Sequence, residues 1–321
     1  MIEVRNLSKW YGEKVGASRI DFTVQRGEVL GLLGPNGSGK TTIMKMVTGC
    51  MPPSEGTVVV DGYDILDSPK EATNRIGFLP EVPPLYPEMR VREYLAFVAA
   101  IRGVEKAKRK GRVEQTMQRV SITQVGERLI RNLSKGYKQR VGLAQAIIAD
   151  PPVLILDEPT VGLDPKQMAE VRELIRDLGR EHTVILSSHI LPEVSMICGR
   201  VIILNRGRII AEDSTENLAR GVADTGRFTL TVKGSAGDAE RILSSIAGIL
   251  SFSPMESAPH LETGYCSFLV VNAKDAAVRV PLFTALSAAA IPIIELRSIG
   301  FSLEEVFLQL TGGPEAEGEE S

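Results

Sequence analysis

The chain has 321 residues, of which 43% are hydrophobic and 24% charged, and its formal net charge at pH 7 is −3. This length suits about two domains of roughly 100–200 residues each. The composition supports a sizeable buried core and excludes a chain that is disordered throughout. The near-neutral charge excludes a globally basic surface of the kind that binds nucleic acid, so no nucleic-acid partner is expected.

No stretch of the sequence is expected to cross a membrane. The longest nearly apolar stretch, residues 285–294, is shorter than the about 20 residues that a span needs, and Pro292 interrupts it. The N-terminal residues are charged and lack the apolar region of a signal peptide. The three cysteines, Cys50, Cys198 and Cys266, have the spacing of neither a disulfide framework nor a metal site. These features predict a soluble, intracellular protein.

Apolar patterning predicts an α/β core over residues 1 to about 220. Strands are expected at residues 2–7, 19–24, 29–33, 58–60, 75–79, 153–156, 183–187 and 200–205. Helices are expected at residues 41–48, within 91–125 and at 167–180. Residues 29–33 and 153–156 are nearly continuous apolar runs, which is typical of strands buried on both faces. The proline-rich residues 80–87 are expected to form a loop.

A second pattern begins after Gly221. Strands are expected at residues 228–232, 249–252, 266–271 and 293–297, and helices at residues 238–247 and 275–289. The order βαββαβ predicts a small α+β domain of the ferredoxin-like type over residues 222–311. A last helix is expected from Ser302, with Glu305 completing a capping box. The glycine-rich, acidic residues 312–321 are expected to be disordered.

One motif predicts a phosphate-binding loop. Residues 34–41 match G-x-x-x-x-G-K-[ST] between an expected strand and an expected helix. Its glycines let backbone N–H groups face phosphate, and the helix start adds a favourable dipole. Lys40 is expected to reach the β and γ phosphates, and the Thr41 hydroxyl to bind Mg²⁺. The candidate nucleotide-binding residues here are Gly34, Pro35, Asn36, Gly37, Ser38, Gly39, Lys40, Thr41 and Thr42.

Two adjacent carboxylates, Asp157 and Glu158, end the expected strand 153–156. They lie at the carboxyl end of that strand, where open α/β sheets bind their ligands. Asp157 is expected to help hold Mg²⁺, and Glu158 to polarise the attacking water as a general base. Together with the phosphate loop, they indicate a nucleotide hydrolase.

Residues 133–137, Leu-Ser-Lys-Gly-Tyr, resemble the LSGGQ signature of ABC-transporter ATPase subunits. The other motifs of that family have similar segments here, in order: Tyr11 in an early Lys-x-Tyr-Gly segment, residues 76–81 as the Q-loop, residues 162–165 as the D-loop, and Ser188-His189 as the switch histidine. Within the family, the chain looks most like ABC-2 export ATPases of the gliding-motility-associated type.

The resemblance implies an ATPase domain at residues 1–221, with a helical subdomain at about 82–150 that presses on a transmembrane permease. It implies a homodimer that closes head to tail on two ATP molecules with Mg²⁺. Ser134 and Gly136 then touch the γ-phosphate of the partner's ATP, and Asp164 of the D-loop joins the nucleotide site. His189 contacts the γ-phosphate and positions water or Glu158. The chain is accordingly expected on the cytoplasmic face of a bacterium-like cell membrane.

Some positions depart from the family's pattern or leave alternatives open. Glu81 stands where a glutamine is common and is expected to contact Mg²⁺ or water, while Lys135 and Tyr137 replace a glycine and a glutamine of the signature. Either Trp10 or Tyr11 can stack on adenine, and motif position favours Tyr11. The remaining histidines, His182 and His260, are expected at the surface.

Two other functions compete with an exporter ATPase. A soluble, non-transport ABC ATPase acting on a macromolecular partner is the main alternative, although such proteins usually carry two cassettes or a long coiled coil. An ATP-binding module without turnover is the other, and the presence of Glu158 and His189 argues against it. Nothing in the sequence identifies the transported substrate.

Overall fold

The chain divides into two compact units, residues Met1–Thr215 and Glu216–Ser321, each with a hydrophobic core of its own. In the computed structural model, the described residues are 2–215, 217, 226–255, 264–273 and 276–298. Several expectations therefore lie outside the described residues. They are the domain boundary after residue 221, His260, the helix from Ser302 and the tail 312–321.

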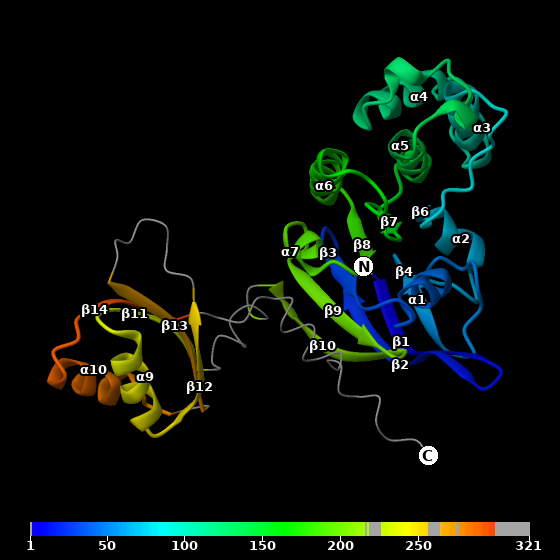
Figure 1. The fold of residues 1–321 in the computed structure, drawn as a ribbon. Coiled ribbons are helices and arrows are strands. Elements are labelled where there is room, and N and C mark those ends of the chain that lie inside the picture. The colour runs from blue at the N-terminus through cyan, green and yellow to red at the C-terminus, as the bar shows by residue number, and fades with distance from the viewer. Residues whose placement is uncertain (1, 216, 218–225, 256–263, 274–275, 299–321) are drawn as a thin grey trace. The chain divides into compact units, whose positions relative to one another are not determined.

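The first unit contains two sheets (Figure 1). The antiparallel sheet has the order β2-β1-β4-β5, with β1 at Ile2–Tyr11, β2 at Lys14–Val24, β4 at Glu55–Val60 and β5 at Tyr63–Asp64. The other has the order β10-β9-β3-β8-β7-β6, with β10 at Arg208–Ser214, β9 at Arg200–Asn205, β3 at Val29–Leu33, β8 at Thr183–Ser188, β7 at Val153–Leu156 and β6 at Ile76–Leu79. Its strands are parallel except β10, which pairs antiparallel with β9.

The core of this unit joins the two sheets around α1 (Lys40–Val47). Val4 and Val58 of the antiparallel sheet belong to the same buried cluster as Leu32 and Ile155 of the parallel strands. β7 is buried at every position, as its continuous apolar run predicts. Because β3, β7 and β8 run parallel, their carboxyl ends meet at one edge of the sheet, where α/β sheets bind ligands.

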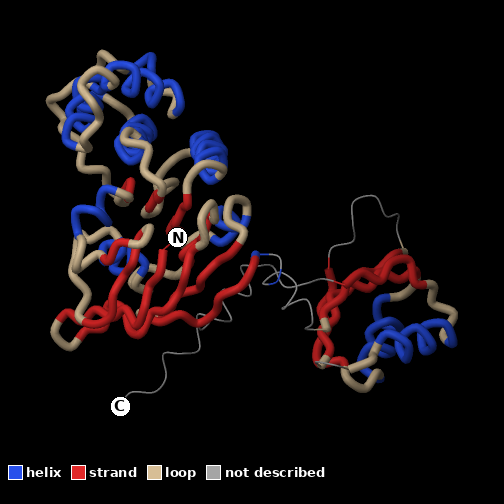
Figure 2. The backbone as a smooth tube through the Cα atoms, turned by 180° about the vertical axis from the view of Figure 1, so that it is seen from behind, coloured by secondary structure: helices blue, strands red, loops and turns tan. Residues whose placement is uncertain are grey.

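Further helices of this unit are α2 (Pro69–Asn74), α3 (Val91–Ile101), α4 (Arg109–Arg119), α5 (Lys135–Ile147), α6 (Pro165–Gly179) and α7 (Leu191–Ser195). The helical pattern at 91–125 becomes α3, α4 and a short 3₁₀ turn, because Gly103 at φ 77° ends the first helix. The helices α3 and α4 lie together at the end of the unit where helices predominate, and the strands gather at the other end (Figure 2).

The second unit has the predicted ferredoxin-like arrangement. Its elements are β11 (Arg227–Lys233), α9 (Ala236–Ser245), β12 (Ile249–Met255), β13 (Tyr265–Asn272), α10 (Arg279–Ala288) and β14 (Ile293–Ser298). The strands form an antiparallel sheet in the order β12-β13-β11-β14, which is the split βαβ topology. Apolar residues of β11 and β13 pack with Leu243 of α9 and Leu282 of α10.

One local prediction is wrong. His182 is buried rather than at the surface, with 4% of its area exposed and Nδ1 at 2.7 Å from the carbonyl of Pro151. The residue immediately precedes β8, and the polar turn before that strand packs on the start of β7. The short elements β5, α2 and α7 were not predicted because each is too brief to show a period.

No helix among the described residues is long and apolar enough to span a bilayer.

Candidate functional site

A cavity of about 480 Å³ opens over the phosphate loop. Its size lies within the ~300–1,000 Å³ range of small-molecule sites. It is lined by Gly16, Asn36, Gly37, Ser38, Gly39, Lys40, Thr41, Thr42, Glu81, Glu158, Val161 and His189. The fold thus brings the loop after β3 together with residues that follow β6, β7 and β8.

Glycines allow the phosphate loop its shape. Gly37 and Gly39 have φ of 82° and 106°, in the left-handed region where other residues are strained. A Cβ on Gly34 would lie 2.5 Å from the carbonyl oxygen of Leu204. The loop therefore lies tightly against its neighbours and leads directly into α1, whose first N–H groups are suited to an anion.

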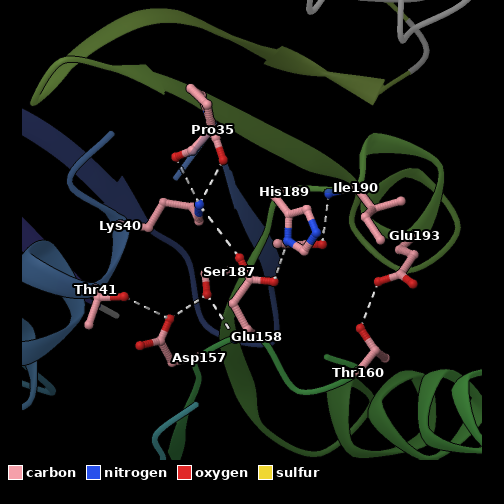
Figure 3. A network of polar contacts seen from close by, with 12 residues as sticks. Pro35, Lys40, Thr41, Asp157, Glu158, Thr160, Ser187, His189, Ile190 and Glu193 are labelled. Atoms are coloured by element: carbon pink, nitrogen blue, oxygen red, sulfur yellow. Dashed lines mark hydrogen bonds and ion pairs between the residues drawn. The ribbon is translucent and has the colours of Figure 1, made fainter. Parts of the chain in front are cut away.

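Lys40 is buried at the centre of this loop (Figure 3). Its Nζ donates to the carbonyl of Gly34 at 2.6 Å and to that of Pro35 at 3.3 Å. The same ammonium lies 3.5 Å from Oε1 of Glu158. A buried cation whose partners are mostly neutral carbonyls is well prepared to bind phosphate oxygens, which would carry the compensating charge.

Asp157 lies beside Thr41 and Ser187. Ser187 Oγ donates to Asp157 Oδ1 at 2.6 Å, and Thr41 Oγ1 lies 3.5 Å from the same oxygen. Burial raises the pKa of Asp157 despite these hydrogen bonds. The deprotonated carboxylate is therefore incompletely compensated, and a nearby cation would stabilise it.

The donor set fits Mg²⁺. Thr41, Asp157 and Glu81 supply hydroxyl and carboxylate oxygens, the ligand type that Mg²⁺ prefers. The part of the chain that the structure describes has no cluster of three or more His, Cys, Asp or Glu side chains suited to a metal. An Mg²⁺ ion here would keep phosphate and water oxygens in its shell, which is the usual arrangement for this ion.

Glu158 has a left-handed backbone, with φ of 47°. For a residue other than glycine this conformation costs about 1–2 kcal/mol, so the surroundings must hold it. Its N–H donates to Ser187 Oγ at 2.9 Å, and its side chain is bound by Lys40 and His189. Ser187 therefore touches both acidic residues. Ser187 was not predicted from the sequence, although a serine near the end of a buried strand is a possible signal.

His189 follows β8 directly and faces the cavity. Its Nδ1 lies 2.9 Å from Oε2 of Glu158 (Figure 3). A carboxylate only accepts hydrogen bonds, so in this contact Nδ1 of His189 is the donor. The contact orients the ring and leaves Nε2 as the ring nitrogen that Glu158 does not bind. The pair thus combines a carboxylate and an imidazole at the mouth of the phosphate loop.

The two aromatic candidates for adenine differ in place. The Tyr11 ring packs on Gly16, where a Cβ would lie 2.6 Å from the ring, and Gly16 lines the cavity over the phosphate loop. Trp10 instead lines another cavity with Arg19 and Glu55. Tyr11 is about half exposed, and the Nζ of Lys9 lies over its ring at 6.0 Å from the centroid. This placement favours Tyr11.

The signature and D-loop residues line a second cavity. Ser134, Gly136 and Asp164 surround it with residues of α5 and α6. Ser134 caps α5 by accepting from the N–H of Tyr137 at 3.5 Å, and Asp164 caps α6 by accepting from Gln167 at 2.9 Å. Within one chain these residues therefore do not join the cavity over the phosphate loop.

Comparison with known proteins identifies the family. A family profile described as ABC transporter matches residues 17–161. The chain is 31% identical over 313 residues to the linearmycin resistance ATP-binding protein LnrL of Bacillus subtilis (strain 168), an alignment that covers 97% of this chain and 98% of LnrL. The chain belongs to the family of ABC transporter ATP-binding proteins.

Other relatives of this ABC transporter ATP-binding protein match it over a shorter part of the chain. It is 35% identical over 222 residues to the bacitracin transport ATP-binding protein BcrA of Bacillus licheniformis, in an alignment that covers 68% of this chain and 72% of BcrA. It is 36% identical over 218 residues to the Nod factor export ATP-binding protein I of Burkholderia lata, covering 68% and 72%.

Solved structures show the same nucleotide-binding fold. An ATP binding subunit of an ABC transporter superposes with a TM-score of 0.63 at 31% identity, covering 69% of this chain and 92% of that one. The dimeric cassette MJ0796 superposes with a TM-score of 0.62 at 26% identity, covering 67% and 98%. A post-hydrolysis dimer of MJ0796 bound to ADP and Pi gives 0.61 at 25% identity, covering 67% and 98%.

Proposed function

We propose that this protein is the ATP-hydrolysing subunit of a membrane exporter. The observation that carries the proposal is the Glu158 carboxylate, held between Lys40 and His189 at the cavity over the phosphate loop. In this arrangement Glu158 accepts a proton from the attacking water, and His189 orients it and contacts the γ-phosphate. Lys40 and the N–H groups of the loop bind the phosphates.

Mg²⁺ would be held by Thr41 and Asp157, with Glu81 contacting the ion or its water. It would supply charge neutralisation for the phosphates. The chain's own residues then supply orientation: Ser187 fixes the Asp157 carboxylate and the Glu158 backbone together. The arrangement is therefore a binding site for ATP with a general base already in place.

We infer that catalysis requires two copies of the chain. The candidate γ-phosphate contacts at Ser134 and Gly136 lie at the start of α5, a 13-residue helix, and face a different cavity from the phosphate loop. A second copy placed head to tail brings the start of α5, with its favourable dipole, to the ATP of the first. The dimeric structures of the MJ0796 cassette support this arrangement.

An exposed surface on α3 and the loop before it suits a transmembrane partner. Tyr86 contacts Phe97 and Tyr94 with ring centroids 5.6 Å and 5.8 Å apart. Tyr86, Phe97 and Ile101 are exposed, and α3 carries the last two one turn apart. Exposed apolar patches mark interaction sites. A permease docked here would place this protein on the cytoplasmic face of the cell membrane, and nucleotide-driven closure would move the permease.

The names of the relatives support export. LnrL is a resistance protein, BcrA is a bacitracin transport protein, and the Burkholderia protein exports Nod factor. Within the family we assign the chain to the ABC-2 export ATPases of the gliding-motility-associated type, on the basis of residues 80–81, 94–95, 133–137 and 164–167.

The test is the hydrolysis rate of Glu158→Gln. The amide keeps the size of the side chain but is not a base, so turnover is expected to fall about 10²–10⁴-fold while ATP binding remains. Glu173→Gln is the matched control, because Glu173 is exposed on α6 and, among the described residues, forms its ion pair with Arg176. If Glu158→Gln hydrolyses ATP at the parent rate, the proposed base is wrong.

A further inference from the structure

Glu193 is a buried carboxylate that the proposed hydrolysis does not use. It lies in α7 with 5% of its area exposed, and its Oε2 accepts a hydrogen bond from Thr160 Oγ1 at 2.6 Å (Figure 3). Its other oxygen, Oε1, is buried without a hydrogen-bond partner among the described residues. A carboxylate with so few partners stabilises a fold less than an apolar side chain of similar size does. Its presence therefore calls for another explanation.

Thr160 connects this carboxylate to the Glu158 turn. Thr160 is two residues beyond Glu158, and the N–H of Val161 donates to the carbonyl of Glu158 at 3.1 Å. The N–H of Leu163 donates in turn to the carbonyl of Thr160 at 3.2 Å. Thr160 thus belongs to one continuous turn that joins Glu158 to Asp164, the N-cap of α6.

The backbone of Glu193 is linked by hydrogen bonds to the segment that contains His189. The N–H of Glu193 donates to the carbonyl of Ile190 at 3.2 Å, and the N–H of Ile190 donates to Ser188 Oγ at 3.0 Å. His189 lies between Ser188 and Ile190, so a displacement of α7 also displaces the imidazole. The Glu193 side chain therefore holds α7, the helix that begins two residues after His189.

Two polar contacts join these segments. One is His189 Nδ1 to Glu158 Oε2 at 2.9 Å, and the other is Thr160 Oγ1 to Glu193 Oε2 at 2.6 Å. The first contact alone leaves the backbone that carries the imidazole free to shift, whereas the second also fixes α7 against the turn after β7. Displacing a catalytic group by about 1 Å can lower a rate roughly 10²-fold.

We propose that Glu193 is a positioning residue: through Thr160 it holds the His189 imidazole against Glu158 and links that pair to the loop at residues 161–164. Because Val161 lines the cavity over the phosphate loop, this link reaches from the wall of that cavity to the imidazole. The inference rests on the proposed hydrolysis and adds a structural cause for the geometry of the Glu158–His189 pair.

The experiment compares ATP turnover and folding stability in four variants. Thr160→Val replaces the hydroxyl by a methyl group of similar size and leaves Glu193 unpaired, while Thr160→Ser keeps the hydroxyl. Glu193→Met removes the carboxylate, and the double variant Thr160→Val with Glu193→Met makes both partners apolar. Each is assayed for kcat and KM with Mg-ATP, for ATP binding by calorimetry, and for thermal unfolding.

The expected result is a split between catalysis and stability. Thr160→Val is expected to lower kcat about 10- to 100-fold with KM within about twofold, and Thr160→Ser to stay close to the parent. The double variant is expected to regain stability, because no buried carboxylate remains unpaired, but its kcat stays low.

Other outcomes overturn the inference. If kcat returns together with stability in the double variant, the bond serves the fold alone. If Thr160→Ser is as slow as Thr160→Val, the hydroxyl is not responsible. A parent protein whose turnover equals that of Glu158→Gln overturns the proposed function and the inference with it, whereas an active parent with an equally active double variant overturns only the inference.

Discussion

Ser187→Ala removes two hydrogen bonds at the centre of the site. Ser187 has none of its area exposed, and its hydroxyl donates to Asp157 Oδ1 at 2.6 Å and accepts from the N–H of Glu158 at 2.9 Å. The substitution leaves a buried carboxylate with one donor fewer and a buried N–H without its acceptor. Each such loss costs about 1–3 kcal/mol, so the free energy of unfolding is expected to fall by about 2–6 kcal/mol.

Thermal unfolding of the first unit measures this effect. For a unit of this size, 1 kcal/mol corresponds to about 2–4 °C, so Ser187→Ala is expected to lower Tm by roughly 4–24 °C. Turnover is expected to fall as well, because the left-handed Glu158 loses the bond that holds its N–H. Ser54→Ala is the control: Ser54 is exposed, accepts one bond from Trp10 N–H at 3.2 Å, and its loss is expected to change stability by less than about 0.5 kcal/mol.

A Ser187→Ala protein that unfolds and turns over like the parent would refute this reasoning. It would mean that the backbone of Glu158 keeps its conformation without Ser187. A protein that loses stability but keeps its turnover would show instead that Ser187 supports only the fold.

Three further outcomes are expected. Burial raises the pKa of Asp157 above its unfolded value, so the contribution of this group to stability is greatest below pH 3.8 and falls as pH rises through the folded pKa. Asp157→Asn should therefore raise Tm more at pH 7 than at pH 4, which scanning calorimetry at the two pH values can check. The same substitution should abolish turnover. Lys40→Ala should lose most ATP binding by calorimetry, and unchanged binding would exclude the phosphate-loop assignment. Cys50 is exposed and should react with iodoacetamide in mass spectrometry, whereas Cys198, which is buried and whose pKa burial raises, should stay unmodified until the protein unfolds.

Strong local patterns made much of the fold predictable. The continuous apolar runs at 29–33 and 153–156 fixed two buried strands, and the βαββαβ order predicted the second unit. The phosphate loop and the pair Asp157–Glu158 were visible because each is a run of adjacent residues whose chemistry depends on that adjacency.

Features built from distant segments were not predictable. Ser187 meets Asp157 and Glu158 only because β7 and β8 are neighbours, and Thr160 meets Glu193 only because α7 packs beside the turn after β7. Such pairing depends on tertiary contacts that a single sequence does not encode locally. The burial of His182 was missed for the same reason: a polar turn looks solvent-exposed until the neighbouring strand is in place.

The most direct test of the central claim is the ATP-dependent dimer of Glu158→Gln. Light scattering with and without Mg-ATP should show that this variant forms a dimer with two bound ATP molecules only when nucleotide is present. Adding Ser134→Arg, which places bulk at the start of α5, should abolish the dimer and leave ATP binding by calorimetry intact. The predicted result is a nucleotide-dependent dimer that Ser134→Arg prevents. A Glu158→Gln protein that binds ATP and remains monomeric, or a dimer unaffected by Ser134→Arg, would contradict the account.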